Sequence, residues 1–215
     1  MIPSLMRVRS VLLLGPTGAG KTPLGAYLEE HGFNGKRCFH FDFGHQLRAI
    51  AGCGLPPEGF TREDHSFIKA VLEKGLLLEN ESFFIAEKII ALFLDRSNFR
   101  DTDILLLNGL PRHVGQAGDM ERIVDIKDII VLECSPENVY RRIRYNTGCD
   151  RADRIDDDIG MVRKKLTVFR GRTAPLVEYY AHAGCKVYSF EVTSSSTAKD
   201  VFNDLRKCIQ QSTSD

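Results

Sequence analysis

The feature that most constrains this chain lies near its N-terminus. An apolar run, Val11–Leu14, is followed at once by Gly-Pro-Thr-Gly-Ala-Gly-Lys-Thr over Gly15–Thr22. The apolar run is typical of a buried strand, and Leu24 and Leu28 continue beyond the motif at helical spacing. A strand, a glycine-rich loop and a helix in that order are the context in which G-x-x-x-x-G-K-[ST] forms a phosphate-binding loop. The sequence therefore predicts a site for a nucleoside triphosphate.

The residue types of this loop suit phosphate chemistry. Glycines let backbone N–H groups turn towards phosphate oxygens, and the positive end of the following helix adds to the attraction. Lys21 supplies a mobile cation for the β- and γ-phosphates, and Thr22 supplies a hydroxyl ligand for Mg²⁺. The predicted ATP-binding residues are Gly15, Pro16, Thr17, Gly18, Ala19, Gly20, Lys21 and Thr22.

Composition argues against several classes of partner. Lys+Arg and Asp+Glu both total 29, so net charge gives no indication of a nucleic acid or an anionic membrane. No apolar run approaches the roughly 20 residues that span a bilayer, and the N-terminal apolar stretch is too short for a signal peptide. The six cysteines show no C-x-x-C spacing, which favours reduced thiols over a zinc site. We expect a cytoplasmic monomer.

Apolar runs and turn residues alternate along the rest of the chain. Strands are predicted at about 9–14, 37–42, 103–108, 128–134 and 185–192. Helices are predicted at about 21–31, 44–51, 62–73, 79–95, 136–145, 157–183 and 197–210, with a kink at Pro175. Strands separated by helices imply a parallel sheet with helices on both faces. The predicted fold is α/β, with three αβα layers around a five-stranded parallel sheet in a single domain of 215 residues.

Ligands of such sheets bind beyond the carboxyl ends of the strands. This rule places four segments on one rim: 15–22, 42–48, 108–112 and the loop after Cys134. We therefore expect the chemistry of the protein at this rim.

Three segments after the phosphate loop resemble motifs of a known family. Asn108-Gly109-Leu110-Pro111-Arg112, followed by Gln116, resembles the D-G-[FY]-P-R-x-x-x-Q signature of adenylate kinases and related nucleoside monophosphate kinases. Asp42–Arg48 resembles their T-G-D-x-L-R segment, at the same distance after the phosphate loop. Arg154–Asp157 resembles their R-x-D-D, and Lys165-Leu166 falls where they have R-L. The matches follow the family's order from about Val11 to Val192.

The resemblance implies a P-loop NTPase fold with a helical acceptor-binding insertion at about 43–78 and a short lid at about 143–154. By the resemblance, Arg48 and Arg112 hold the monophosphate acceptor, and Arg154 and Lys165 hold the migrating phosphoryl group. Transfer between two nucleotides requires many phosphate charges to be clamped, which suits a set of arginines. No general base is demanded, because a phosphate oxygen is already an adequate nucleophile.

The full set of implied roles is as follows. The catalytic residues are Lys21, Arg112, Arg154 and Lys165, and Arg142 lies on the base or phosphates of ATP. The acceptor-binding residues are Phe43, Gly44, Arg48, Gly109, Arg112 and Gln116.

Three positions depart from the family pattern. Phe43 replaces a small residue beside the acceptor base, and Asn108 replaces the Asp that holds Mg²⁺-bound water. Asp42 is an acid at the end of the second strand, where the family usually has none. The predicted magnesium ligands are Thr22, Asn108 through water, and Asp42. The alternative for Asp42 is a cap on the helix that follows it.

The lid carries further departures. Lys165 is a compact point charge without the planar fork of arginine, so Arg163 is an alternative clamp. Asn146 stands where the family often has a second lid arginine, and Arg144 or Arg151 are candidates to compensate.

The predicted activity is Mg²⁺- and ATP-dependent phosphorylation of a nucleoside monophosphate. AMP is the first choice, because Gln116 can offer an amide donor and acceptor to an adenine edge. Two alternatives stay open. One is a P-loop kinase for another small acceptor, namely CMP or UMP, shikimate or a sugar. The other is a nucleotide-binding sensor with weak catalysis, which Asn108 and Phe43 suggest.

Overall fold

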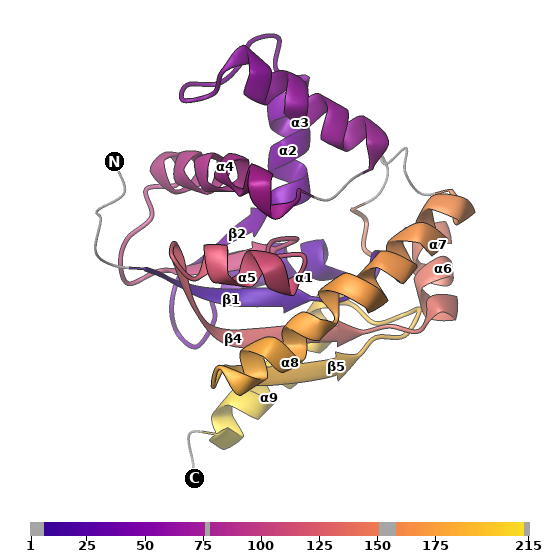
Figure 1. Ribbon diagram of the computed structural model, residues 1–215. Helices are drawn as coiled ribbons and strands as arrows, with labels where there is room; N and C mark the ends of the chain where they lie inside the picture. The colour runs from indigo at the N-terminus through magenta and orange to yellow at the C-terminus, as the bar shows by residue number, and fades with distance from the viewer. Residues whose placement is uncertain (1–6, 76–77, 151–157, 213–215) are drawn as a thin grey trace.

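The computed structural model describes residues 7–75, 78–150 and 158–212 (Figure 1). Its strands are β1 (Val8–Leu14), β2 (Cys38–Asp42), β3 (Ile104–Asn108), β4 (Val124–Glu133) and β5 (Lys186–Glu191). They form one sheet in the order β2-β3-β1-β4-β5, and every neighbouring pair is parallel. The predicted α/β fold with a five-stranded parallel sheet is confirmed.

Helices cover both faces of this sheet. The helices in the described part of the chain are α1 (Lys21–His31), α2 (Phe43–Gly52), α3 (Arg62–Lys74), α4 (Phe83–Arg96), α5 (Val114–Met120), α6 (Pro136–Arg144), α7 (Ile159–Val168), α8 (Pro175–His182) and α9 (Ala198–Ser212). A single 3₁₀ turn, Asn80–Ser82, precedes α4, and a π-helical segment, Phe169–Thr173, joins α7 to α8.

The central strand β1 shows how the layers form. Its residues alternate between faces, as strand geometry requires. Val11 and Leu13 pack with α1 and α9, whereas Leu12 and Leu14 pack with α4, α5 and α8. Figure 1 looks onto the face that α5 and α8 cover. Because β1 is apolar on both faces, it lies in the middle of the sheet, and the loop that follows it emerges at the centre of the rim.

Three elements differ from the sequence prediction. The strand expected at 128–134 begins earlier, at Val124, and the glycine-containing helix α5 was not expected. The single helix expected at 157–183 is divided, because the π-helical segment interrupts it just before Pro175 at the start of α8. The amide of Ala174 donates to the carbonyl of Phe169 at 2.8 Å, which is the wider π spacing.

The helices α2 and α3 stand at one end of the molecule, where α2 begins at the end of β2 and α3 lies on the outer side, farther from the sheet (Figure 1). They lie within the segment 43–78, for which an acceptor-binding role is predicted. The predicted lid at 143–154 is described only as far as residue 150. Among the described residues, no helix combines the length and apolar character that crossing a membrane would require.

Candidate phosphoryl-transfer site

Two glycines fix the path of the loop between β1 and α1. Gly15 has a φ of 151°, and a Cβ there would lie 2.8 Å from the carbonyl oxygen of Leu132. Gly20 has a left-handed φ of 98°, and a Cβ there would lie 3.0 Å from a guanidinium nitrogen of Arg142. Only glycine fits both positions without strain. The loop is therefore held close to β4 and to α6.

Lys21, the first residue of α1, folds back over this loop. Its Nζ donates to the carbonyl oxygens of Gly15 at 2.7 Å and Pro16 at 2.8 Å. The side chain is half-buried, so its charge is partly shielded from water but remains accessible. This arrangement places a cation at the helix N-terminus, where an anion also meets the positive end of the helix dipole.

Arg142 of α6 also contacts the loop, through its guanidinium group. Its side chain is buried, and Nε donates to the Gly18 carbonyl at 2.9 Å. Its Nη1 donates to the carbonyls of Thr193 at 2.9 Å and Ser196 at 2.7 Å. Burial lowers the pKa of this guanidinium, although arginine stays protonated at neutral pH. Arg142 thus connects the phosphate loop to the segment between β5 and α9.

Two cavities flank the loop. One, of about 160 Å³, is bounded by Gly20, Arg142, Thr147, Ser196 and Val201 among others. The second, of about 270 Å³, lies between Pro16, the end of β4 and the π-helical segment, where Phe169 and Arg170 line it. The loop therefore has hollows on both sides, each lined in part by an arginine.

The predicted metal residues lie together at the ends of β2 and β3. Asp42 and Asn108 are register partners on these adjacent strands. Thr22 Oγ1 donates to Asp42 Oδ2 at 2.6 Å, and Asn108 Nδ2 donates to the same carboxylate oxygen at 2.9 Å. Asp42 also caps α2, because its Oδ1 accepts from the His45 amide at 2.9 Å. Both interpretations of Asp42 from the sequence are therefore compatible with its position.

This donor set fits a magnesium ion that is shared with a nucleotide. A hydroxyl and a carboxylate are the hard oxygen ligands that Mg²⁺ prefers, usually with several waters and substrate phosphates. Burial acts to raise the pKa of Asp42, but hydrogen bonds from Thr22 and the His45 amide, together with the nearby His40 and Arg48, hold the pKa below its usual value. Among the described residues, no group of three or more His, Cys, Asp or Glu side chains could hold a metal alone. Phosphate oxygens would have to complete the coordination.

The turn after β3 positions Arg112. Its Nε donates to the Gly109 carbonyl at 3.0 Å, and its own carbonyl accepts from Thr173 Oγ1 at 2.7 Å. Its backbone amide donates to Gln116 Oε1 at 2.9 Å. The backbone of Arg112 is therefore held by α5 and by the π-helical segment, and its half-buried side chain is held by its own turn.

Gln116 lies deeper than the sequence suggested. It is only 1 % exposed, and its Nε2 donates to the Leu78 carbonyl at 2.7 Å. The Gln116 amide thus links Leu78, at the end of the predicted insertion, to the backbone of the Arg112 turn. These bonds use one donor and one lone pair, and a glutamine amide can offer one more of each. That Gln116 contacts the acceptor base stays a prediction.

The remaining residues predicted to bind the acceptor lie at the start of α2. Phe43 is buried, with its ring 6.1 Å from that of Phe41, centroid to centroid, and it lies beside Gly109. Arg48 is exposed, and its guanidinium lies over Gly44. Phe43 is thus part of the core under the rim, while Arg48 is at its surface.

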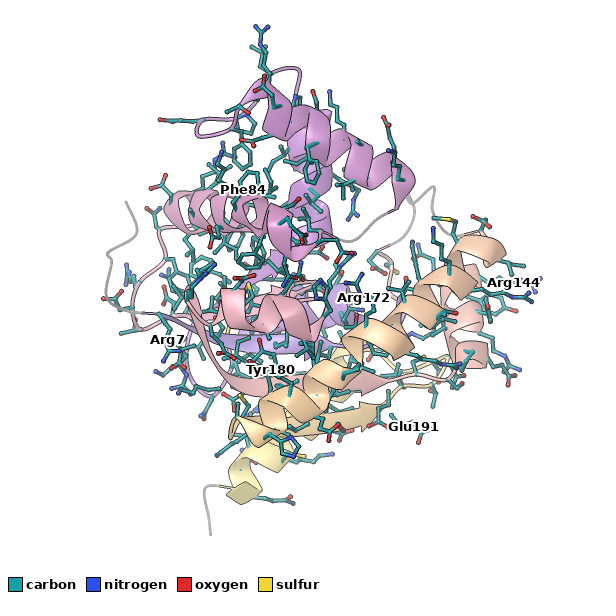
Figure 2. The ribbon with its side chains drawn as sticks, viewed as in Figure 1. Arg7, Phe84, Arg144, Arg172, Tyr180 and Glu191 are labelled. Atoms are coloured by element: carbon teal, nitrogen blue, oxygen red, sulfur yellow. The ribbon has the colours of Figure 1, made fainter. Side chains whose placement is uncertain are left out.

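Several residues predicted in the lid and after it have no described contact with the site. Arg154, Arg151, Asp156 and Asp157 fall in 151–157, outside the described residues. Lys165 is half-buried on α7, and Arg163 is exposed on the same helix. Arg144 is exposed at the outer end of α6 (Figure 2). Their roles in phosphoryl transfer stay predictions.

A cluster that the sequence analysis missed joins three segments near Arg112. Arg172, labelled in Figure 2, donates to both carboxylate oxygens of Glu79 at 2.7 and 2.8 Å. His113 Nε2 lies 3.8 Å from Glu79 Oε2. The pKa of Glu79 is lowered, chiefly by the hydrogen bond from Arg172. These residues stand in no motif, and their partners are distant in sequence, so no local pattern indicated the contact.

Adenylate kinases and UMP-CMP kinases are among the known proteins that are similar to this chain in sequence. No family model matches the chain. The chain is 29% identical over 182 residues to an adenylate kinase of Synechococcus sp. (strain WH7803), which covers 81% of this chain and 85% of that protein. It is 28% identical over 211 residues to an adenylate kinase of Nitrobacter hamburgensis, with 93% of each chain covered. It is 28% identical over 204 residues to UMP-CMP kinase 3 of Oryza sativa subsp. japonica, with 93% of this chain and 85% of that protein covered.

Among solved structures, a gluconokinase from Sinorhizobium meliloti 1021 is similar at a TM-score of 0.48 and 14% identity, over 96% of this chain and 97% of that one. The sequence similarities to these three kinases run through most of the chain.

Proposed function

We propose that this chain transfers the γ-phosphoryl group of ATP to the phosphate of a nucleoside monophosphate. The chain is a distant homologue of adenylate kinases and UMP-CMP kinases, and by homology it is a transferase of the nucleoside monophosphate kinase family. The observation that supports this reaction best is that two segments suited to phosphate binding lie at the same edge of the sheet. These are the loop that carries Lys21 and the turn that carries Arg112.

The transfer needs little covalent chemistry from the protein. An oxygen of the acceptor phosphate forms a bond to the γ-phosphorus as the bond from that phosphorus to the β,γ-bridging oxygen breaks. The products are ADP and a nucleoside diphosphate. Catalysis of such a step is mostly positioning and charge stabilisation. Lys21 would hold the β- and γ-phosphates, and Arg112 would hold the acceptor phosphate. Arg154 and Lys165 would hold the phosphoryl group during its transfer. Mg²⁺, when bound beside Thr22, would neutralise charge on the β- and γ-phosphates.

The donor base would occupy the 160 Å³ cavity beside the loop. Its lining combines apolar side chains such as Leu24 and Val201 with Arg142. Apolar walls with a few polar groups are the usual lining of a pocket for a flat organic ring. Arg142 would then act on ATP from a fixed position, since its hydrogen bonds hold it against the loop.

The acceptor would lie on the side of α2 and the Arg112 turn. Arg48 and Arg112 would take its phosphate, with Gly44 and Gly109 allowing close approach, and Phe43 and Gln116 would contact its base. AMP is our first choice, with CMP and UMP next. That the chain acts as a monomer is also part of this proposal.

The proposal is tested by measuring ADP formation from ATP with a panel of acceptors. The panel contains AMP, CMP, UMP, GMP, shikimate and a set of sugars, each with Mg²⁺. We expect turnover with nucleoside monophosphates and the highest kcat/KM with AMP. Turnover with shikimate or a sugar alone would reject the nucleotide acceptor. ATP binding without turnover on any member would indicate a sensor instead.

We predict that Gln116→Ala raises the KM for AMP by about tenfold or more and changes the KM for ATP little. A buried polar group that is matched to a base edge discriminates strongly, since a wrong base leaves its partners unpaired. Steady-state kinetics with AMP, CMP and UMP would measure the effect. A matched loss with every acceptor would show that Gln116 only fixes the Arg112 turn, and equal effects on ATP and AMP would reject an acceptor role.

We predict that Phe43→Thr changes the ranking of AMP, CMP, UMP and GMP as acceptors. Because Phe43 packs beside Gly109 at the rim, a smaller residue opens space there. Removing most of a buried ring also costs about 3 kcal/mol of stability, so kcat/KM is compared at a temperature where the variant is folded. Phe41→Leu, which alters the same core under β2, is the control. An unchanged ranking would mean that Phe43 only packs.

A further inference from the structure

One carboxylate stands at an unusual place in the phosphoryl-transfer site. Asp42 ends β2, Asn108 ends β3, and Thr22 begins α1 after the phosphate loop. The three side chains form a closed triangle, because Asn108 Nδ2 lies 2.9 Å from Asp42 Oδ2 and 3.1 Å from Thr22 Oγ1, and Thr22 Oγ1 lies 2.6 Å from Asp42 Oδ2. The nearest carboxylate to the loop hydroxyl is therefore on β2.

The amide of Asn108 is matched to this carboxylate. It presents N–H donors to Asp42, whereas an aspartate at position 108 would place a second carboxylate at about the same separation. Two carboxylates so close cannot both ionise easily. The pair Asp42 and Asn108 therefore carries one negative charge, and the identity of the β3 residue complements that of the β2 residue.

The hydrogen of the Thr22 hydroxyl is also assigned by this triangle. Since Oγ1 donates to Asp42, its lone pairs remain for other partners, and Asn108 takes one. A cation beside the loop would thus meet a hydroxyl oxygen whose proton is donated to a carboxylate. Carboxylates that orient a metal ligand in this way typically change metal affinity by about 10- to 100-fold.

We propose that Asp42 is the carboxylate through which this chain holds nucleotide-bound Mg²⁺, and that Asn108 is its neutral partner across the strands. The inference rests on the proposed use of Mg²⁺ and ATP, and it assigns the charge to β2 instead of β3. The competing explanation is that Asp42 only caps α2 through its bond to the His45 amide.

The test separates these explanations with an isosteric exchange. Asp42→Asn keeps a capping oxygen but removes the charge, and Asp42→Asn combined with Asn108→Asp moves the charge to β3. The readout is the dissociation constant of the non-hydrolysable analogue AMP-PNP, measured by calorimetry with Mg²⁺ and again with EDTA. The ratio of the two constants reports how much the protein favours the metal-bound nucleotide, and it needs no turnover.

We expect Asp42→Asn to reduce this ratio by about tenfold and the double exchange to return it to within about threefold of the original. Asp103→Asn is the control for lost stability, since Asp103 is a buried carboxylate before the opposite end of β3 and pairs with Arg37. It should lower the melting temperature and leave the ratio unchanged. If Asp42→Asn does not fold, Asp42→Ser, which also keeps a capping oxygen, takes its place.

Two outcomes would overturn the inference. One is an unchanged ratio in folded Asp42→Asn or Asp42→Ser, which would make Asp42 a cap only. The other is a double exchange that binds metal-bound nucleotide no better than the single variant. Failure of the original chain to bind AMP-PNP at all would instead count against the proposed use of ATP, so the two failures can be told apart.

Discussion

Replacing Lys21 by alanine is expected to lower kcat by a factor on the order of 10²–10³, the usual effect of removing one preorganised charge-stabilising group. The ammonium group is held at the start of α1 by the carbonyls of Gly15 and Pro16, where the triphosphate would arrive. The measurement is ADP formation from ATP at saturating acceptor.

The fold should survive this change. Lys21 is only half-buried, so water can reach the two carbonyls when the ammonium group is gone. We expect the melting temperature and the circular dichroism spectrum to stay close to those of the original chain. Lys36→Ala, which removes an exposed lysine in the turn before β2, is the matched control and should keep full activity. A Lys21→Ala variant with unchanged kcat would contradict the assignment of the phosphate loop.

The centre of the fold follows directly from the sequence. Val11–Leu14 is apolar at every position, so it must be buried on both faces, and the glycine motif after it can only turn into a helix. Once the alternation of strands and helices implies a parallel sheet, the carboxyl ends of the strands meet at one rim. The approach of Thr22, Asp42 and Asn108 was therefore predictable as a neighbourhood, although not as a set of hydrogen bonds.

Other elements depend on tertiary contacts. The helix α5, Val114–Met120, contains two glycines and has weak intrinsic helix propensity. It forms because Ala117 and Met120 are buried against the core. The π-helical segment before Pro175 is likewise set by its surroundings, since Thr173 Oγ1 donates to the Arg112 carbonyl. Local patterns do not contain these long-range contacts.

The candidate site likewise combines residues that motifs predicted with contacts that the sequence did not indicate. Arg112 was found because it stands in a motif, but the groups that hold it were not. Gln116 reaches the Leu78 carbonyl and Arg172 reaches Glu79 across separations of 38 and 93 residues. A single sequence gives no signal for such pairs, because neither spacing nor periodicity relates the two partners.

Arg142→Ala is expected to weaken both ATP binding and the fold. The guanidinium donates to three backbone carbonyls, those of Gly18, Thr193 and Ser196, and it is only 5 % exposed. A hydrogen bond to a charged group contributes about 1.5–3 kcal/mol, so losing the set should cost about 3 kcal/mol or more. For a chain of this size, each kcal/mol corresponds to about 2–4 °C in melting temperature.

The kinetic effect of this variant should be selective for the donor. Without Arg142 the Gly18 carbonyl is released and the cavity beside Gly20 loses a wall, so the KM for ATP should rise about tenfold or more, as expected for a lost charge-assisted contact. The KM for the acceptor should change little, because Arg112 is held by separate bonds. Arg141→Ala is the matched control, since the adjacent arginine is exposed and pairs with Glu137 on the surface of α6. It should leave both constants and the melting temperature nearly unchanged. Equal increases in both KM values for Arg142→Ala would mean that Arg142 supports the whole fold and has no particular role at the donor site.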